Sequence, residues 1–252
     1  MRVVAPPRPT LVFIHGAQND HGVWAVLGRH FAAQGYPVVT PDLPGHGGNT
    51  DAPLTSIDAM AAWMATELAQ LGAGGTALVL IGHSMGSLVA LECAARASAG
   101  TSTRIAGLVL IGTAVPMKVS PALLQQARAD EAGAIAQIVL WSHLPLANGG
   151  RNEIMAQAQA MMARQPRGLL YTDLAACDAY AHGLEAASAI RCPGLIIAGS
   201  QDRMTPPKAI RVLHQTLAAA RLVSIANGSH SLMAEFPDAI QTTIADFLVP
   251  LR

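Results

Sequence analysis

The sequence predicts an α/β fold in which one mainly parallel sheet is covered by helices on both faces. Short runs of Val, Ile and Leu alternate along the chain with longer segments whose apolar residues recur every three or four positions. This alternation is typical of β-α-β units. The short runs are apolar throughout, as expected of strands buried on both faces. A length of 252 residues fits a single large domain of this class.

Six segments are predicted strands because they are short, apolar and rich in β-branched residues or Leu. They are residues 10–15, 36–41, 77–82, 105–111, 194–199 and 221–225. The segments between them predict helices. One set of apolar residues would share a helix face: Ile57, Met60, Met64, Leu68 and Leu71. Thr205 followed by Pro206 predicts the N-cap and first residue of a later helix.

The alternation stops between residues 114 and 188. This stretch is rich in Met, Ala and Gln, has helical periodicity, and is broken near Pro145 and Gly149-Gly150. We therefore expect a helical cap at residues 114–188, inserted into a core formed by residues 1–113 and 189–252.

Charge and composition argue against several classes of partner. Lys and Arg together number 16, as do Asp and Glu, so there is no net field to attract nucleic acid. No apolar run approaches the roughly 18 residues that a membrane span requires. Residues 1–8 lack an apolar stretch of signal-peptide type, so we expect a cytoplasmic protein. Three well-separated cysteines give no zinc or redox spacing, and we expect neither a metal nor an organic cofactor.

A candidate nucleophile follows the third predicted strand. Gly82-His83-Ser84-Met85-Gly86 stands between that strand and a predicted helix, which is the strand-turn-helix setting of a nucleophile elbow. The tight turn leaves no room for Cβ atoms two residues to either side of the serine, hence the glycines. The N-terminus of the following helix favours negative charge beside the hydroxyl.

A serine hydroxyl needs a base, and the base needs a carboxylate that orients it. Asp202 follows the predicted strand at residues 194–199, and His230 follows the strand at residues 221–225. Among the nine histidines, His230 stands out because it comes after a strand and a glycine turn. Ser84, Asp202 and His230 are therefore the predicted catalytic triad.

These motifs, together with His15-Gly16 and the turn from Asp42 to Gly47, resemble the α/β-hydrolase superfamily in its cap-bearing, serine-esterase-like branch. The resemblance spans nearly the whole chain and implies the α/β-hydrolase fold. It implies an oxyanion hole formed by the backbone N–H groups of Ala17 and Met85. It also implies a structural role for the turn from Asp42 to Gly47. Because only about nine residues precede the first predicted strand, we expect the leading antiparallel strand pair of that family to be missing or vestigial.

The predicted activity is hydrolysis of a carboxylic ester of a small, largely apolar substrate through an acyl-enzyme intermediate. Thioesterases, lactonases and carbon-carbon bond hydrolases use the same triad, so these chemistries stay open. A non-catalytic small-molecule-binding member of the fold is the alternative from another class. In the cap, Met117, Leu140 and Trp141 are the predicted substrate contacts. The sequence carries no signal for the oligomeric state.

Overall fold

In the computed structural model, which describes residues 8–100, 102–144 and 152–251, six strands form one sheet in the order β2-β1-β3-β4-β5-β6. The strands are β1 (Thr10–Ile14), β2 (Val38–Val39), β3 (Leu78–His83), β4 (Ile105–Ile111), β5 (Gly194–Gly199) and β6 (Ala220–Ile225). All pairings between these described strands are parallel. β2 is shorter than predicted because Pro37 and Pro41, which flank it, cannot donate hydrogen bonds to a neighbouring strand.

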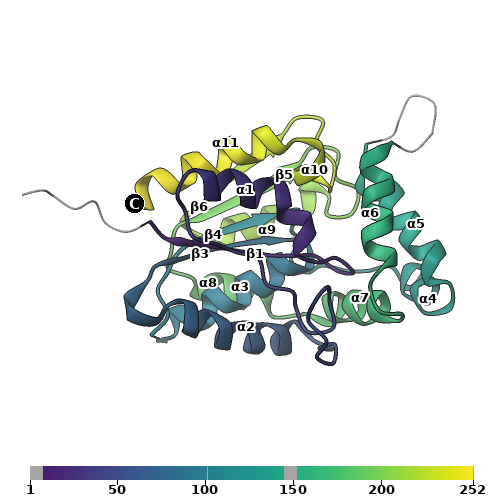
Figure 1. Cartoon of the computed structure of the whole chain (residues 1–252), viewed down its shortest axis with the longest axis horizontal. Coiled ribbons are helices and arrows are strands. Elements are labelled where there is room, and N and C mark those ends of the chain that lie inside the picture. The colour runs from purple at the N-terminus through teal and green to yellow at the C-terminus, as the bar shows by residue number, and fades with distance from the viewer. Residues whose placement is uncertain (1–7, 101, 145–151, 252) are drawn as a thin grey trace, which may run out of the picture.

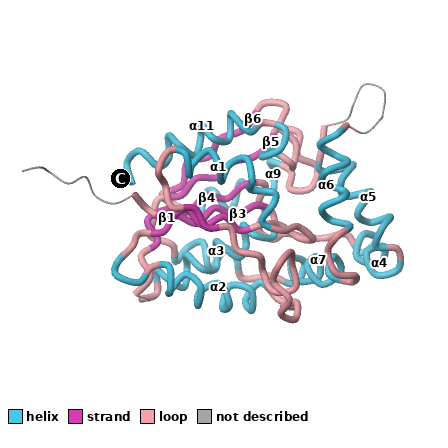
Figure 2. Tube along the Cα trace, viewed as in Figure 1, coloured by secondary structure: helices cyan, strands magenta, loops and turns pink. Residues whose placement is uncertain are grey.

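Successive residues of each strand belong to two separate hydrophobic clusters, as expected because successive side chains point to opposite faces of the sheet. Leu11 and Phe13 lie in one cluster, whereas Val12 and Ile14 lie in the other. The first cluster is covered by α1 (Ala25–Ala33), α10 (Leu232–Glu235) and α11 (Pro237–Leu248). The second is covered by α2 (Ile57–Leu71), α3 (Met85–Ser98), α8 (Gly183–Ala189) and α9 (Pro207–Thr216). Figures 1 and 2 show the resulting three layers, with the sheet between helices.

Four helices between β4 and β5 stand apart at one end of the sheet among the described residues (Figure 1). They are α4 (Pro121–Ala129), α5 (Glu131–Ser142), α6 (Glu153–Ala163) and α7 (Leu169–Ala179). They share a hydrophobic cluster of their own. α8 instead packs in the core cluster. The cap boundaries at residues 114 and 188 stay a prediction. The breaks predicted near Pro145 and Gly149-Gly150 lie outside the described residues.

Short 3-10 turns complete the fold at His21–Trp24, Ala73–Gly75 and Val249–Leu251. Polar side chains accept hydrogen bonds from the first turns of several helices: Ser56, Ser120, Asp130 and Asn152. The predicted N-cap at Thr205 is wrong, because α9 begins at Pro207 and Pro206 precedes it as the cap residue. The Thr205 hydroxyl donates instead to Asp202. No helix within the described part of the chain is long and apolar enough to cross a membrane.

The crossing of α3 over the sheet depends on two glycines. A Cβ at Gly86 would lie 2.2 Å from the carbonyl oxygen of Ile14, and one at Gly82 would lie 2.2 Å from that of Gly86. Both obstacles are backbone atoms, which cannot swing aside as a side chain would. The first turn of α3 therefore rests directly on β1 and β3.

Buried polar contacts join the cap to the core. Asp173 of α7 is fully buried, and its Oδ2 accepts hydrogen bonds from the Gln18 backbone N–H at 2.8 Å and from His46 Nε2 at 2.9 Å. Gln165 accepts from the Gly47 N–H at 2.9 Å. Burial alone would lower the pKa of His46, but the hydrogen bond and charge of Asp173 raise it overall. The cap is thus fixed to the loop after β1 and to the turn that contains His46.

Gly86→Ala is expected to reduce the free energy of unfolding by about 3 kcal/mol, because the added methyl group meets rigid backbone. Gly28→Ala is the matched control: its Cβ would lie 3.7 Å from a Val38 methyl group, an ordinary contact. Within α1, this change should stabilise the protein by up to about 1 kcal/mol. Urea unfolding of the three proteins checks both, and a Gly86→Ala protein as stable as the wild type would contradict the packing described.

Asp173→Asn is expected to lower the free energy of unfolding by about 3 kcal/mol at acidic to neutral pH, since it breaks a buried ion pair. The His46 pKa is raised, so the pair stabilises the fold fully below the unfolded value of about 6.5 and loses this effect as pH rises through the folded value. The difference from wild type should therefore narrow at alkaline pH.

Urea titrations between about pH 5.5 and 9 would measure this difference. Asp178→Asn, also in α7, removes a part-exposed ion pair with Lys118 and should cost less than about 1 kcal/mol. A loss for Asp173→Asn no greater than that of Asp178→Asn, or one that grows with pH, would refute the proposed ion pair.

Candidate active site

Ser84 lies in the sharp turn between β3 and α3. Its backbone has φ 52° and ψ −123°, a conformation that non-glycine residues rarely adopt and that is found where the surrounding structure imposes it. The Ser84 N–H donates to the Ile111 carbonyl at 3.0 Å, and the Ser84 carbonyl accepts from the Ser87 N–H at 2.8 Å. These bonds, with the two glycines of the turn, hold the Ser84 side chain on the wall of a pocket.

Asp202 and His230 come together from the loops after β5 and β6. His230 Nδ1 lies 2.8 Å from Asp202 Oδ2, and both side chains are buried. Because a carboxylate only accepts hydrogen bonds, Nδ1 carries the proton and Nε2 is left as the basic nitrogen of the neutral ring. His230 lines the same pocket as Ser84. The side chains of Ser84 and His230 make no hydrogen bond in the described structure; such bonds often form only with substrate bound.

Asp202 is surrounded by hydrogen-bond donors. Oδ1 accepts from the N–H groups of Met204 and Thr205, and Oδ2 accepts from the Thr205 hydroxyl, all at 2.8 Å. Burial by itself raises the pKa of Asp202, but the charge and hydrogen bond of His230 and the donors of Thr205 lower it overall. The carboxylate therefore stays ionised at neutral pH. Thr205 therefore belongs to the candidate site. The sequence did not reveal this role, because Thr205 before Pro206 is a pattern typical of a helix cap.

The backbone of His230 is held by His83, the residue before the nucleophile. His83 Nε2 donates to the His230 carbonyl at 3.0 Å. Burial, together with the nearby His230, lowers the pKa of His83 to about 3, so its ring is neutral. This role could not be predicted from the sequence, because the position between the first glycine and the serine of the elbow accepts many residue types.

The predicted oxyanion-hole residues follow two neighbouring strands. Ala17 comes after β1, and Met85 is the first residue of α3 after β3. β1 and β3 adjoin where the strand order reverses, the position at which open parallel sheets bind ligands. The first N–H groups of a helix have no partner within that helix. Ala17 lines the pocket, and the next N–H, that of Gln18, is already donated to Asp173. The oxyanion hole itself stays a prediction.

The pocket has a volume of about 240 Å³ and lies between the core and the cap. Its apolar wall comes from the 3-10 turn at His21–Trp24, five helices (α1, α5, α6, α7 and α10) and the loop after β5. The apolar residues of this wall are Val23, Val26, Ile138, Val139, Ile154, Met161, Met162, Leu170, Leu174, Met204 and Met233. A few polar side chains interrupt this wall, among them Asn19, Gln157 and His143. The cavity suits a small, largely apolar molecule.

The three predicted substrate contacts of the cap do not line this pocket. On α5, Ile138, Val139 and Ser142 face inward, so helical geometry turns Leu140 outward, where it is 46% exposed. Trp141 packs against the cap's own cluster, and Met117 packs in the core cluster. We therefore replace Met117, Leu140 and Trp141 by the pocket residues named above.

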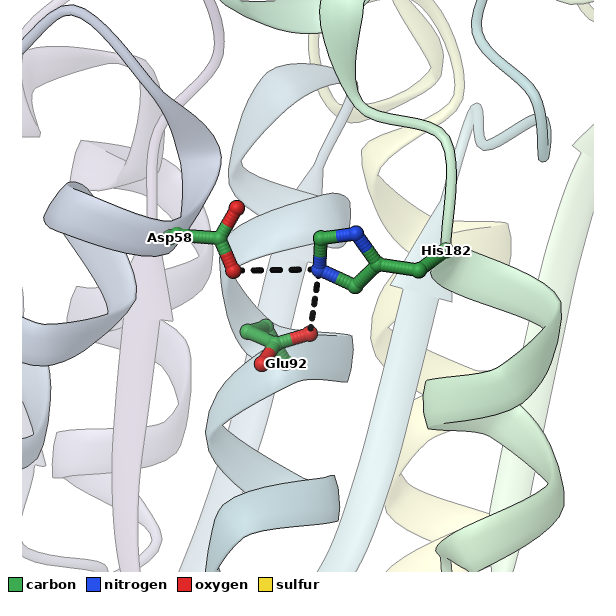
Figure 3. Close-up of side chains that lie close together, drawn as sticks. All are labelled: Asp58, Glu92 and His182. Atoms are coloured by element: carbon green, nitrogen blue, oxygen red, sulfur yellow. Dashed lines mark hydrogen bonds and ion pairs between the residues drawn. The ribbon is translucent and has the colours of Figure 1, made fainter.

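A second polar cluster lies outside the pocket (Figure 3). His182, just before α8, has its Nε2 3.0 Å from Asp58 of α2 and 3.8 Å from Glu92 of α3. Arg96 already pairs with both carboxylates, and the Tyr180 hydroxyl donates to Glu92 at 2.8 Å. These contacts join α2 and α3 to the chain that returns from the cap, which supports a structural role.

Residues 11–241 match the alpha/beta hydrolase family. A pimeloyl-[acyl-carrier protein] methyl ester esterase of Stenotrophomonas maltophilia is 26% identical, over 96% of this chain and 94% of its own. A putative carbamate hydrolase, RutD, of Klebsiella pneumoniae is 28% identical, over 98% of this chain and 93% of its own. The enol-lactonase of Burkholderia xenovorans superposes with a TM-score of 0.81 at 26% identity, covering 98% of this chain and 93% of its own. With its fold, its elbow and this match along most of its length, the chain belongs to the α/β-hydrolase family.

Proposed function

We propose that this protein is a serine hydrolase that cleaves a carboxylic ester of a small, largely apolar substrate. One observation carries the proposal: Ser84, in a strained turn, and His230, which is hydrogen-bonded to the buried Asp202, line the same apolar pocket. The esterase activity named for the methyl ester relative, and the hydrolase and lactonase activities named for the others, support acyl chemistry of this kind.

In the proposed mechanism, Ser84 Oγ attacks the ester carbonyl while His230 Nε2 takes its proton. The negative charge on the former carbonyl oxygen is stabilised by the N–H groups of Met85 and Ala17. Asp202 holds the ring and stabilises the imidazolium. The carbonyl then re-forms, the alkoxy group leaves with the proton from His230, and an acyl-Ser84 ester remains. Water, deprotonated by His230, attacks this ester and releases the acid.

A lactone is the second candidate substrate. It contains the same acyl-oxygen bond, so Ser84 and His230 would act on it without any further group. The structural likeness to the enol-lactonase favours this candidate over thioesters and carbon-carbon bonds. The volume of about 240 Å³ limits either substrate to a compact molecule.

Ser84→Ala should reduce hydrolysis of p-nitrophenyl esters on the order of 10⁴-fold or more, because no other group can form the acyl-enzyme. The assay would run from acetate to palmitate, and the pocket volume predicts the best rates at short to medium chains. Ser98→Ala, at the exposed far end of α3, is the matched control and should keep full activity.

Undiminished turnover by Ser84→Ala would refute the proposed nucleophile. Failure of the wild type to cleave any ester or lactone, with the folded protein verified, would refute the proposed function and leave thioester or carbon-carbon bond hydrolysis, or a small-molecule-binding role.

Thr205→Val should lower kcat for the best ester about tenfold with little change in KM. It removes one donor to the charged Asp202, which holds His230, while preserving the branched shape of the side chain. Thr205→Ser, which keeps the hydroxyl, should recover most of the rate. Steady-state kinetics of the three proteins measure this, and equal kcat values for the wild type and Thr205→Val would remove Thr205 from the site.

A further inference from the structure

His143 follows α5 and forms part of the pocket wall. It is only 3% exposed. Its Nδ1 lies 2.8 Å from the carbonyl oxygen of Val139, one turn back in the helix. A carbonyl oxygen can only accept, so Nδ1 must carry a hydrogen and donate it. This bond fixes the orientation of the ring and determines which nitrogen is protonated.

The other ring nitrogen is unsatisfied. Nε2 of His143 is buried and has no hydrogen-bond partner among the described residues. Burial lowers the pKa of His143 by more than the hydrogen bond to Val139 and the charge of Glu235 raise it, so at neutral pH the ring is uncharged and Nε2 is an acceptor. A buried polar atom without a partner costs about 1–3 kcal/mol, so an unpaired acceptor on a residue that lines a pocket is an unusual feature.

The end of α5 is attached to the loop that carries His230. The Ser142 carbonyl accepts from the Ser231 N–H and from the Ser229 hydroxyl, both at 2.8 Å. The Leu144 N–H donates to Glu235 at 2.8 Å, and the same carboxylate accepts from Ser229. His143 is therefore held between two tethered residues and cannot easily turn to find another partner.

The position of His143 favours a contact with substrate over a role in folding. The two ring nitrogens form hydrogen bonds in well-separated directions. The hydrogen bond of Nδ1 points back along α5. Nε2 therefore faces away from its own helix. Neighbouring atoms cover Nε2 in this structure, so a donor group of the substrate contacts it only once side chains of the wall have shifted. The pocket wall around His143 is mostly apolar. A hydroxyl or N–H group on a bound ester could donate a hydrogen bond to Nε2. A carboxylate has no hydrogen to donate at neutral pH, so its oxygens would be repelled by the lone pair of Nε2.

We propose that Nε2 of His143 accepts a hydrogen bond from a hydroxyl or N–H group of the substrate, so that the enzyme selects esters that carry such a donor. The proposal rests on the proposed ester hydrolysis and adds a chemical class of substrate to it. His143 is a specificity residue in this proposal and takes no part in bond making or breaking.

Two pairs of esters, each pair of closely similar shape, test the proposal by titration of the released acid. Methyl 3-hydroxybutyrate is compared with methyl 3-methylbutyrate, and 2-hydroxyethyl butyrate with propyl butyrate. In the wild type, kcat/KM should favour the hydroxyl ester of at least one pair about tenfold, the effect of roughly 1.4 kcal/mol for one hydrogen bond. In His143→Phe, which keeps a ring without an acceptor, this ratio should fall to about one.

The ratio within each protein cancels any general loss of activity in a variant. His143→Gln, whose side-chain oxygen can accept, should keep part of the preference, and Leu140→Ala, on the exposed side of α5, should keep all of it. Equal ratios in the wild type and His143→Phe, or a preference for methyl hydrogen succinate over the hydroxyl esters, would overturn the proposal while ester hydrolysis stands. Absence of turnover on every ester would overturn both.

Discussion

The turn at Ser84 depends on contacts between backbones that are too close for any side chain. Gly82 and Gly86 let the first turn of α3 lie against β1 and β3, and this proximity brings the start of α3 beside the loop after β1. A strained residue persists only where its neighbours impose the conformation. Here the imposing parts are the parallel sheet and a helix on its surface. The local strain at Ser84 is thus balanced by a large buried apolar core.

Polar contacts then fix the parts that the hydrophobic core leaves free. The loops after β1, β5 and β6 have few apolar side chains to anchor them, and each is held by a buried acceptor. Asp173 holds the loop after β1, Asp202 organises the loop after β5, and the Ser142 carbonyl holds the loop after β6. Two of these three acceptors belong to the cap. The cap therefore shapes the candidate site even though its helices provide none of the three predicted catalytic residues.

The sequence was informative wherever a residue's role follows from its own neighbours. Runs of apolar residues identified all six strands, because a strand covered on both faces has no polar side to obscure it. Ser84, Asp202 and His230 could be predicted as a triad because each comes within five residues of the end of a strand of one sheet, so the topology brings them to one edge. Cap contacts could not be predicted in this way. The orientation of α5 decides that Val139 faces the pocket and Leu140 does not, and that orientation depends on the packing of several helices together.

The same distinction explains why Thr205 and His143 escaped detection. Thr205 stands before a proline, a pattern typical of a helix start, but the buried carboxylate of Asp202 is a stronger acceptor of its hydroxyl than any partner at the helix end. His143 has no motif around it at all. Its importance lies in one ring nitrogen that is paired and another that is not, and such a difference exists only in three dimensions.

An apolar pocket alone discriminates weakly between substrates, since one methylene group changes binding by only about 1–3 kcal/mol. A buried polar atom is more selective, because a substrate without the matching group leaves that atom unpaired. In this pocket Ala17, Ser84 and His230 belong to the proposed chemistry, which leaves His143 as a fixed and unpaired acceptor within the described wall. Because its helix end is tethered to both neighbours of His230, a donor group bound there would lie close to the bond that is cleaved. Selection and reaction would then depend on the same short segment, and a small ester would suffice to engage both.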